Sequence, residues 1–265
     1  MSKLIVVVPM AGDGQRFKDA GYDIPKPLIE VDGKPLFMHA VDSLKFRHLD
    51  DVEYIFMCRE EHNVDNKLSE KIFSYIKNSH VFYTKEKTRG SLETIMKALN
   101  YYETYFKTIS DDTKILSIDC DFAFDCKTFI YTVEHEVTDS YFCHPCLMTF
   151  YAKDPKYSFV EPDVIRGTVK RTAEKIPISN YAIAGCYFLG NWRLLRQSYY
   201  QYEQDFTYGK IDIKELYVSN IYNYYRDKGE IVLFVDMNFH TDMLWSFNVP
   251  ADLENYDKNK SIWDK

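Results

Sequence analysis

The sequence predicts an α/β fold in which a Rossmann-like, mixed and mainly parallel sheet carries helices on both of its faces. Two observations support this prediction. Across residues 1–140, short apolar runs alternate with segments of helical periodicity. Such alternation is typical of strand–helix–strand units, which place parallel strands side by side. From about residue 141, strand-like runs follow one another directly, which predicts antiparallel strands in the second half.

The first half is expected to contain four buried strands with helices between them. Apolar runs predict strands at 4–8, 54–58, 81–83 and 115–118. Helical patterns predict helices at 35–44, 63–77 and 91–106. The last helix is expected to have Ser91 as its N-cap, because a serine hydroxyl can accept a hydrogen bond from a free backbone N–H of the first turn.

The second half is expected to be richer in strands. Strand-like runs predict strands at 142–151, 158–161, 168–173, 182–189 and 231–235. Helices are expected at 192–203, 211–226 and 250–256. No linker rich in glycine, proline or serine separates the two halves, and no internal repeat is present. We therefore expect a single domain over residues 1–265.

Composition and charge limit the class of protein. The chain has 265 residues, of which 46% are hydrophobic, so it can bury a sizeable core. Its formal net charge of −7 argues against a broad nucleic-acid-binding face. No apolar run approaches the ~20 residues of a membrane-spanning helix, so no membrane partner is expected. The chain enters an apolar run at Leu4 without a signal-peptide pattern, which favours a cytoplasmic location.

The six cysteines are expected to be buried thiols, because disulfide frameworks are rare in cytoplasmic chains of this size. Cys143 and Cys146 have the spacing of a zinc knuckle, but no second pair follows them. They lie in an apolar stretch typical of a strand, and strand cysteines are therefore favoured over a zinc site.

A glycine-rich loop directly follows the first predicted strand. It consists of Met10, Ala11, Gly12, Asp13, Gly14, Gln15 and Arg16. Gly12 and Gly14 have no Cβ, so the backbone N–H groups of this loop can lie along a polyphosphate. The fork of donors on Arg16 can clamp phosphate oxygens. The alternative is a strand-to-helix turn with a surface arginine.

A second short loop presents Lys26 between Pro25 and Pro27. The two prolines restrict the backbone on either side of the lysine. One ammonium group can therefore be aimed with little loss of entropy.

Two carboxylates, Asp119 and Asp121, follow the apolar run 115–118. Residues two apart in a strand point to the same face, so both can reach one hard cation if the strand geometry continues that far. Mg²⁺ suits such a site, because it takes one or two carboxylates together with phosphate oxygens and waters. Ligands of parallel sheets bind beyond the carboxyl ends of the strands, so these aspartates should meet the glycine-rich loop there. The alternative is that both aspartates only cap the following turn.

The glycine-rich loop and the proline-flanked lysine resemble the signature of the nucleotidyltransferases that activate sugar 1-phosphates, the sugar pyrophosphorylase family. That signature is a strand, then G-x-G-x-R, then P-K-P-L, which here read Gly12-Asp13-Gly14-Gln15-Arg16 and Pro25-Lys26-Pro27-Leu28. Gln15 stands where the family commonly has serine or threonine. The resemblance covers nearly the whole chain and implies a nucleotidyltransferase (GT-A-like) fold. It also implies a stand-alone form, without the C-terminal β-helix of some bifunctional relatives.

The resemblance divides the chain into a nucleotide-binding half, 1–140, and an acceptor-binding half, 141–265. It implies that Asp121 binds the metal, with Asp119 as the second candidate. Thr88, Gly90 and Ser91 lie in a segment similar to the one whose backbone contacts the base and ribose in relatives. The alternative for this segment is an ordinary glycine turn before a helix.

The run from Tyr157 to Tyr187 resembles the acceptor-binding block of the family. The resemblance implies that Lys175 contacts the phosphate of the acceptor and that Gly185 lies against the acceptor. Glu174 is then a partner for a hydroxyl or amine of the acceptor. Glu215 is similar to a residue at a helix start that borders the acceptor pocket in relatives.

One segment departs from the family pattern. Many relatives carry a second metal-binding aspartate just before a G-T-P segment, where this chain has Ser246 and then Asn248-Val249-Pro250. Three options stay open. Metal binding rests on Asp121 with Asp119, or Asp242 moves in, or the site is altered.

The implied activity is transfer of a nucleoside monophosphate from a nucleoside triphosphate to a phosphorylated acceptor, with Mg²⁺ as cofactor and with Arg16 and Lys26 as catalytic residues. A sugar 1-phosphate is the expected acceptor, for capsule or surface-polysaccharide precursors. The alternative is transfer from CTP to a small non-sugar phosphate, phosphocholine-like or phosphoglutamine-like. A glycosyltransferase has no use for the glycine-rich loop and lysine, whereas a non-catalytic regulatory relative stays open. The base and the oligomeric state, including a homo-oligomer, also stay open.

Overall fold

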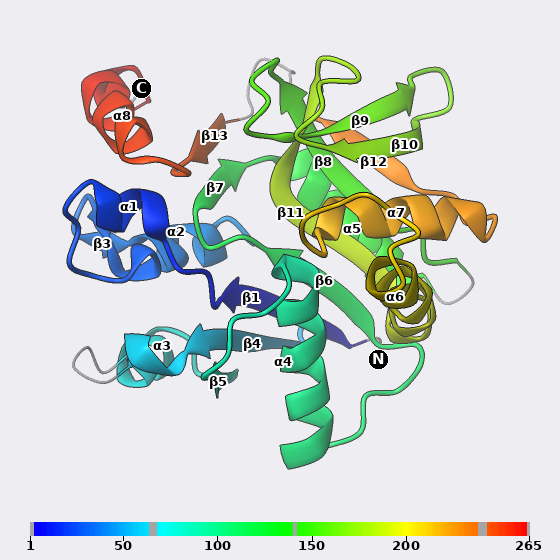
Figure 1. The fold of residues 1–265 in the computed structure, drawn as a ribbon, viewed down its shortest axis with the longest axis horizontal. Coiled ribbons are helices and arrows are strands. Elements are labelled where there is room, and N and C mark those ends of the chain that lie inside the picture. The colour runs from blue at the N-terminus through cyan, green and yellow to red at the C-terminus, as the bar shows by residue number, and fades with distance from the viewer. Residues whose placement is uncertain (1–2, 64–67, 140–141, 238–242, 264–265) are drawn as a thin grey trace.

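The computed structural model describes residues 3–63, 68–139, 142–237 and 243–263. Its main element is a nine-stranded sheet with the strand order β5-β4-β1-β6-β11-β8-β12-β10-β9 (Figure 1). One sheet thus includes strands from both halves of the chain, and helices lie on both of its faces. This arrangement confirms the predicted α/β fold.

The first half supplies the parallel part of the sheet. Its strands are β1 (Leu4–Met10), β4 (Val52–Arg59), β5 (Ser79–Thr84) and β6 (Lys114–Ile118). β1 pairs in parallel with β4 and with β6, and β4 pairs in parallel with β5. Three helices of this half are α2 (Leu36–Asp42), α3 (Leu68–Tyr75) and α4 (Ser91–Tyr105). All four strands therefore have their carboxyl ends at the same edge of the sheet.

The second half makes the sheet mixed. Its strands are β8 (Cys146–Tyr151), β9 (Ser158–Asp163), β10 (Thr168–Glu174), β11 (Tyr181–Asn191) and β12 (Leu233–Asp236). β11 is antiparallel to β6, β8 and β9, and β10 is antiparallel to β9 and β12, while β8 and β12 are parallel. Its helices that pack on the sheet are α6 (Trp192–Thr207) and α7 (Val218–Asp227). The antiparallel strands predicted for this half are thus present.

The remaining elements complete the chain around the sheet. They are α1 (Gln15–Asp19), the 3₁₀ helices η1 (Lys26–Leu28) and η2 (Glu60–His62), β2 (Glu30–Val31), β3 (Lys34–Pro35), β7 (Phe122–Asp125), α5 (Lys127–Thr138), β13 (Met243–Ser246) and α8 (Pro250–Trp263). β7 and β13 form a separate antiparallel pair beside α8 (Figure 1). Within the described residues, no helix has both the length and the apolar character needed to cross a bilayer.

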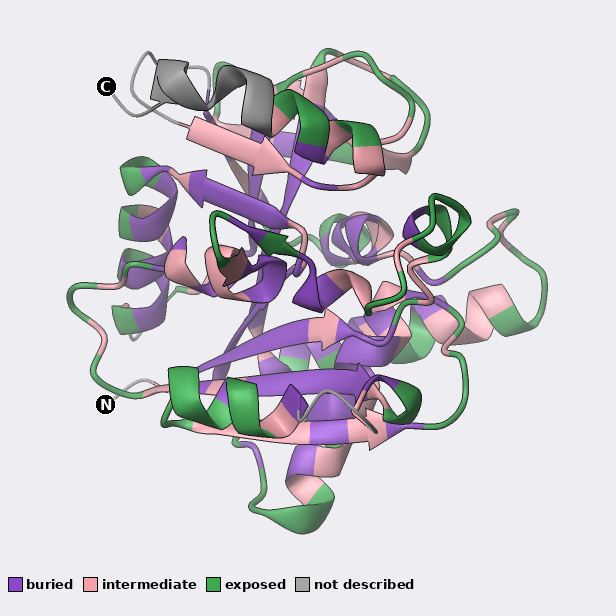
Figure 2. Cartoon of the chain, turned by 90° about the vertical axis from the view of Figure 1, so that its left-hand side faces the viewer, coloured by how far each residue is buried: buried purple, intermediate pink, exposed green. Residues whose placement is uncertain are grey.

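Alternate residues of β1 enter two separate hydrophobic clusters. Leu4, Val6 and Val8 pack on the face covered by α2, α3 and α5, whereas Ile5 and Val7 pack on the face covered by α4, α6 and α7. A strand buried on both faces reads as a continuous apolar run, which explains the pattern of this segment. Figure 2 shows buried residues along the strands and exposed ones on the outer sides of the helices.

The helix expected at 211–226 begins only at Val218, which corrects that prediction. Residues 211–217 form a loop whose backbone bonds to another segment. The Leu216 N–H donates to the Arg89 carbonyl at 2.7 Å, and the Leu216 carbonyl accepts from the Leu92 N–H at 3.0 Å. These bonds take the place of a helical ladder. Glu215 consequently lies in a loop and not at a helix start.

Two further boundaries differ from expectation. The strand predicted at 142–151 begins at Cys146, because the His144 N–H donates to the Glu136 carboxylate at 2.6 Å and Pro145 has no N–H to contribute to a ladder. Gly90, and not Ser91, is the N-cap of α4. The helix predicted at 63–77 is described from Leu68 to Tyr75, and residues 64–67 lie outside the described residues.

All six cysteines are free thiols, as expected. Five of them are buried, and Cys143 is partly exposed. Cys146 starts β8, while Cys143 precedes the strand.

A charged network lies at the start of β1 and β4. Glu53 is mostly buried and pairs with Lys3 at 2.7 Å and with Lys107 at 3.1 Å, while the Tyr102 hydroxyl donates a hydrogen bond to it. Burial alone would raise the pKa of Glu53. The hydrogen bonds from Lys3, Tyr102 and Lys107 outweigh it and lower this pKa to about 2.

We expect this network to make stability fall at acid pH. A folded-state pKa below the ordinary value of 4.5 means that the unfolded chain takes up the proton first. The contribution of Glu53 to the free energy of unfolding is therefore fully present above pH 4.5. It is lost as the pH falls from this value through about 2. Urea unfolding measured across this acid range should show a flatter pH dependence for Glu53→Gln than for the wild type. The exposed Glu30→Gln is the control, and equal slopes for all three proteins would contradict the prediction.

Candidate active site

One cavity collects most of the residues that the sequence singled out. It has a volume of about 380 Å³ and lies beyond the carboxyl ends of β1 and β6, the edge at which α/β sheets bind ligands. The predicted residues that line it are Met10, Ala11, Gly12, Asp13, Gly14, Lys26, Thr88, Gly90, Ser91, Asp119, Asp121 and Glu215. Segments more than a hundred residues apart in the chain therefore meet in one place.

The glycine-rich loop is held in position by its own acidic residue. The Asp13 carboxylate pairs with the Lys87 ammonium at 2.7 Å and with the Arg59 guanidinium at 3.5 Å. The hydrogen bond from Lys87 lowers the pKa of Asp13. Because two cations compensate this carboxylate, its charge opposes an anionic ligand less than an isolated carboxylate would.

Lys26 is aimed into the cavity by the segment that contains it. It begins η1 directly after Pro25, and its ammonium forms an ion pair with Asp121 and lies 5.2 Å from the centre of the Phe17 ring. The side chains of Lys26 and Asp121 are only 17% and 13% exposed. The lysine is thus fixed beside the carboxylates before any ligand enters.

Asp119 and Asp121 lie in the turn between β6 and β7, since β6 ends at Ile118. Strand geometry therefore does not continue as far as the sequence pattern required, yet both aspartates line the cavity. Burial and the neighbouring Asp121 carboxylate raise the pKa of Asp119 well above its ordinary value, against the opposing charge of Lys26. Two carboxylates that repel each other in a partly enclosed space favour a bound cation.

Gly185 of β11 lies directly against this turn. The Asp119 N–H donates to the Gly185 carbonyl at 2.7 Å. A Cβ at position 185 would lie 2.7 Å from Asp119 Oδ2 and 2.5 Å from the Phe122 ring. The absence of a side chain at Gly185 is therefore what allows Asp119 to occupy its place.

The donor set of this turn fits Mg²⁺, which prefers carboxylate oxygens and keeps several waters. Within the described residues, no group of three or more His, Cys, Asp or Glu side chains could hold a metal ion. Asp242, one option for a further ligand, lies outside the described residues. Ser246 lies in β13 opposite Phe122.

The segment that leads into α4 brings bare backbone to the cavity. Gly90 has a φ of 145°, and a Cβ there would lie 2.5 Å from the carbonyl oxygen of Leu216. The hydroxyls of Thr88 and Thr94 hydrogen-bond to each other at 2.7 Å, which fixes the approach to the helix. The absence of a side chain at Gly90 is therefore what allows the backbone of Leu216 to pack against this segment.

Glu174 and Lys175 do not line this cavity and form a neighbouring cluster. Glu174 ends β10, and its carboxylate accepts hydrogen bonds from two serine hydroxyls, that of Ser219 at 2.9 Å. Lys175 has a left-handed backbone with a φ of 56°, and its ammonium lies 4.9 Å from the centre of the Tyr217 ring. The charge of Glu174 contributes to the raised pKa of Asp119, so the cluster lies close to the carboxylate turn.

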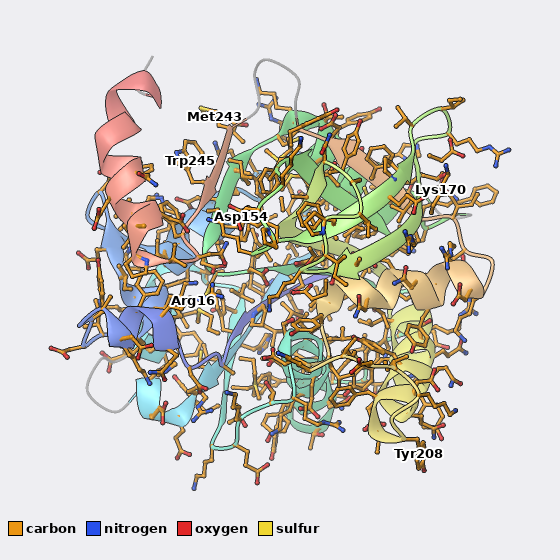
Figure 3. The ribbon with its side chains drawn as sticks, turned by 45° about the horizontal axis from the view of Figure 1, so that its top comes forward. Arg16, Asp154, Lys170, Tyr208, Met243 and Trp245 are labelled. Atoms are coloured by element: carbon orange, nitrogen blue, oxygen red, sulfur yellow. The ribbon has the colours of Figure 1, made fainter. Side chains whose placement is uncertain are left out.

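Gln15 and Arg16 begin α1 and do not line the cavity. Figure 3 labels Arg16 on this helix. The Gln15 amide donates to Asp19 at 2.6 Å within the same helix. The Arg16 side chain is exposed. The role of Arg16 toward phosphate therefore stays a prediction.

Sequence reasoning assigned no role to three other polar residues of the cavity wall, Lys87, Thr94 and Asn248. Lys87 directly precedes the segment from Thr88 to Ser91, which is predicted to bind nucleotide. A cation next to such a segment is the sequence signal that points to this residue. Asn248 departs from the family pattern, and the sequence alone gives no further sign that it lies in this wall.

The fold and this cavity define a class of protein, namely α/β transferases that act on nucleotides. A comparison with protein families then gives the family itself. Residues 5–244 match the nucleotidyl transferase family, so the chain belongs to it and is a nucleotidyltransferase. This finding confirms the family implied by the sequence resemblance.

Individual proteins are similar to this chain in fold or over part of the sequence. A nucleoside-diphosphate-sugar pyrophosphorylase from Vibrio cholerae RC9 has a similar structure, with a TM-score of 0.81, 24% identity and coverage of 96% of this chain and 99% of the other. An inositol-1-phosphate CTP transferase from T. maritima is also similar in structure, with a TM-score of 0.68 and 18% identity. The match covers 99% of this chain and 97% of the other. A curated 2-C-methyl-D-erythritol 4-phosphate cytidylyltransferase from Rhodopirellula baltica is 39% identical over 67 residues, which span 25% of each protein.

We expect Gly185→Ala to destabilise the protein, because the added Cβ must push aside Asp119 or the Phe122 ring. Overpacking of this kind typically costs about 1–3 kcal/mol. Urea unfolding measures the loss. Gly209→Ala is the control, since its Cβ would meet open space and only its φ of 66° opposes the change. Wild-type stability for Gly185→Ala would refute the close packing described here.

Proposed function

We propose that this nucleotidyltransferase transfers a nucleoside monophosphate from a nucleoside triphosphate to a sugar 1-phosphate and releases pyrophosphate. The observation that carries the proposal is the single cavity in which the loop 10–14 and Lys26 face Asp119 and Asp121. The loop and the lysine suit a triphosphate, and the carboxylates suit the metal that accompanies it. The name of the similar V. cholerae protein, a nucleoside-diphosphate-sugar pyrophosphorylase, supports a sugar phosphate as the acceptor.

The proposed reaction forms one P–O bond and breaks another. An oxygen of the acceptor phosphate attacks the α-phosphorus of the triphosphate. The bond from the α-phosphorus to the oxygen that bridges to the β-phosphate breaks, and pyrophosphate leaves with the electron pair. Both reactants are anions, so positioning and charge compensation by the protein dominate catalysis.

On the nucleotide side, Lys26 neutralises charge at the α-phosphate, for which its ion pair with Asp121 already positions it. Arg16 holds the β- and γ-phosphate oxygens that leave as pyrophosphate. The backbone of the loop 10–14 lies along the triphosphate. Thr88, Gly90 and Ser91 contact the base and ribose.

On the acceptor side, Lys175 holds the phosphate in line for attack. Glu174 binds a hydroxyl or amine of the acceptor, and its hydrogen bonds from serine hydroxyls orient the carboxylate for this role. Gly185 and Glu215 border the acceptor. In this assignment, residues 1–140 supply the nucleotide-binding half of a single domain, and residues 141–265 supply the acceptor-binding half.

Asp121 and Asp119 would hold Mg²⁺ through their carboxylate oxygens. When bound, Mg²⁺ supplies positive charge that offsets the repulsion between the two phosphorylated reactants. The product would be a nucleotide-activated sugar, a precursor suited to capsule or surface-polysaccharide synthesis in the cytoplasm.

A second candidate function is transfer of CMP from CTP to a small non-sugar phosphate. Two similar proteins favour it, because the T. maritima protein is an inositol-1-phosphate CTP transferase and the R. baltica protein is a cytidylyltransferase. The same cavity and the same residue roles serve this reaction. It differs from the first candidate only in the base and in the acceptor.

We expect Lys26→Ala and Arg16→Ala each to lower turnover by roughly a hundredfold or more, because a preorganised charge at a developing anion is worth about 3–4 kcal/mol. The fold should stay intact, which circular dichroism checks. Lys71→Ala, an exposed lysine on α3, is the control and should keep full activity. Full activity in either test variant would remove that residue from the mechanism.

Pyrophosphate release with Mg²⁺, measured over a grid of substrates, tests the function itself. CTP, UTP, dTTP, GTP and ATP are each combined with sugar 1-phosphates and with non-sugar phosphates such as phosphocholine. We expect one productive pair, and its members decide between the two candidates. Release of pyrophosphate from no pair, together with no binding of any triphosphate, would refute the proposal.

A further inference from the structure

The wall of the nucleotide cavity carries more acidic than basic side chains. The charged side chains among its described residues are the carboxyl groups of Asp13, Asp119, Asp121 and Glu215 and the ammonium groups of Lys26 and Lys87. A nucleoside triphosphate is a polyanion, and local cations determine whether such a wall attracts it. Its binding therefore depends on which of the two lysines can turn from a carboxylate to a phosphate.

Lys87 is the lysine that has room to change its partner. Its side chain is 72% exposed, whereas that of Lys26 is 17% exposed. Lys87 lies between β5 and α4, and Asp13 lies between β1 and α1, so their ion pair at 2.7 Å joins two loops of the cavity wall. An exposed ion pair contributes little net stability, because water and salt screen it. Exchange of its partner therefore costs little.

A second cation, Arg59, also lies beside Asp13. Its Nη1 lies 3.5 Å from the Asp13 carboxylate, and its side chain is only 13% exposed. In the described part of the chain, the buried Nε and Nη1 of Arg59 make no hydrogen bond. A buried donor without an acceptor costs free energy, so a closer approach of the Asp13 carboxylate would be favourable. Asp13 thus keeps a cationic partner when Lys87 leaves it.

We propose that Lys87 binds the triphosphate by exchanging Asp13 for phosphate oxygens, while the Asp13 carboxylate passes to the guanidinium of Arg59. This inference rests on the proposed function, because that function places the triphosphate along the loop 10–14. A phosphate group offers more negative charge and more acceptor oxygens than one carboxylate does. It is therefore the stronger partner for the ammonium of Lys87.

Binding of nucleoside triphosphates with Mg²⁺ but without an acceptor, measured by isothermal titration calorimetry, tests this inference. CTP, UTP, dTTP, GTP and ATP are titrated in turn, and the one that the wild type binds most tightly is used for the variants. Lys87→Ala should weaken binding by roughly tenfold, because a charge-assisted hydrogen bond to phosphate is lost. Lys85→Ala should leave binding unchanged. It is the matched control, since Lys85 lies in the same loop, is 84% exposed and does not line the cavity.

The variant Asp13→Asn separates a direct contact from a structural role. Removal of the competing carboxylate should strengthen triphosphate binding, and Lys87→Ala should then cost more affinity in the Asp13→Asn background than in the wild type. A loss no larger than in the wild type would overturn the inference, since Lys87 would then act only through Asp13 or independently of it. Thermal unfolding of each variant confirms that it is folded.

The same titrations distinguish this inference from the proposed function. Wild-type affinity in Lys87→Ala, with a triphosphate bound, would overturn the role of Lys87 and leave the proposed function standing. No binding of any triphosphate by the wild type would overturn both.

Discussion

The antiparallel pairing of β6 with β11 is the constraint on which the rest of the site depends. Ile118 faces Cys186 across this pairing, and Asp119, the first residue after β6, donates its N–H to the Gly185 carbonyl. The carboxylate turn is thereby fixed against the second half of the chain. β1 pairs with the other side of β6 in parallel, so the glycine-rich loop reaches the same edge. One strand, β6, thus sets the distance between the two halves of the site.

The central strands and the loops of the cavity can be predicted because the residues of each segment alone determine its conformation. β1 is a continuous apolar run, and the conformation of its following loop depends on glycines within it. The helix α5 was not predicted, since Lys127–Thr138 contains several β-branched and aromatic residues with modest helix propensity. Its buried Phe129, Val133 and Val137 pack in the same hydrophobic cluster as alternate residues of β1. Packing of these side chains in the core therefore determines α5, a helix that the local sequence pattern does not predict.

The parts of the site that the sequence did not reveal depend on contacts between distant segments. Lys87 gains its place in the cavity by pairing with Asp13, 74 residues earlier. Asn248 reaches the cavity because β13 pairs with β7, an arrangement that neither segment specifies alone. The protein carries a net charge of −7, yet the cations Lys26, Lys87 and Arg59 gather at the loop beside the carboxylates. Local cations, and not the total charge, determine whether this edge accepts an anion.

The loop 211–217 contacts two separate segments of the chain, the one at Gly90 and the one at Lys175. The backbone of Leu216 packs on Gly90 and bonds to its neighbours Arg89 and Leu92, while the adjacent Tyr217 lies against the ammonium of Lys175. A change that shifts this loop at Gly90 would therefore also move the ring beside the Lys175 ammonium. Under the proposed function, a substitution here would alter the preference for the base and the preference for the acceptor together.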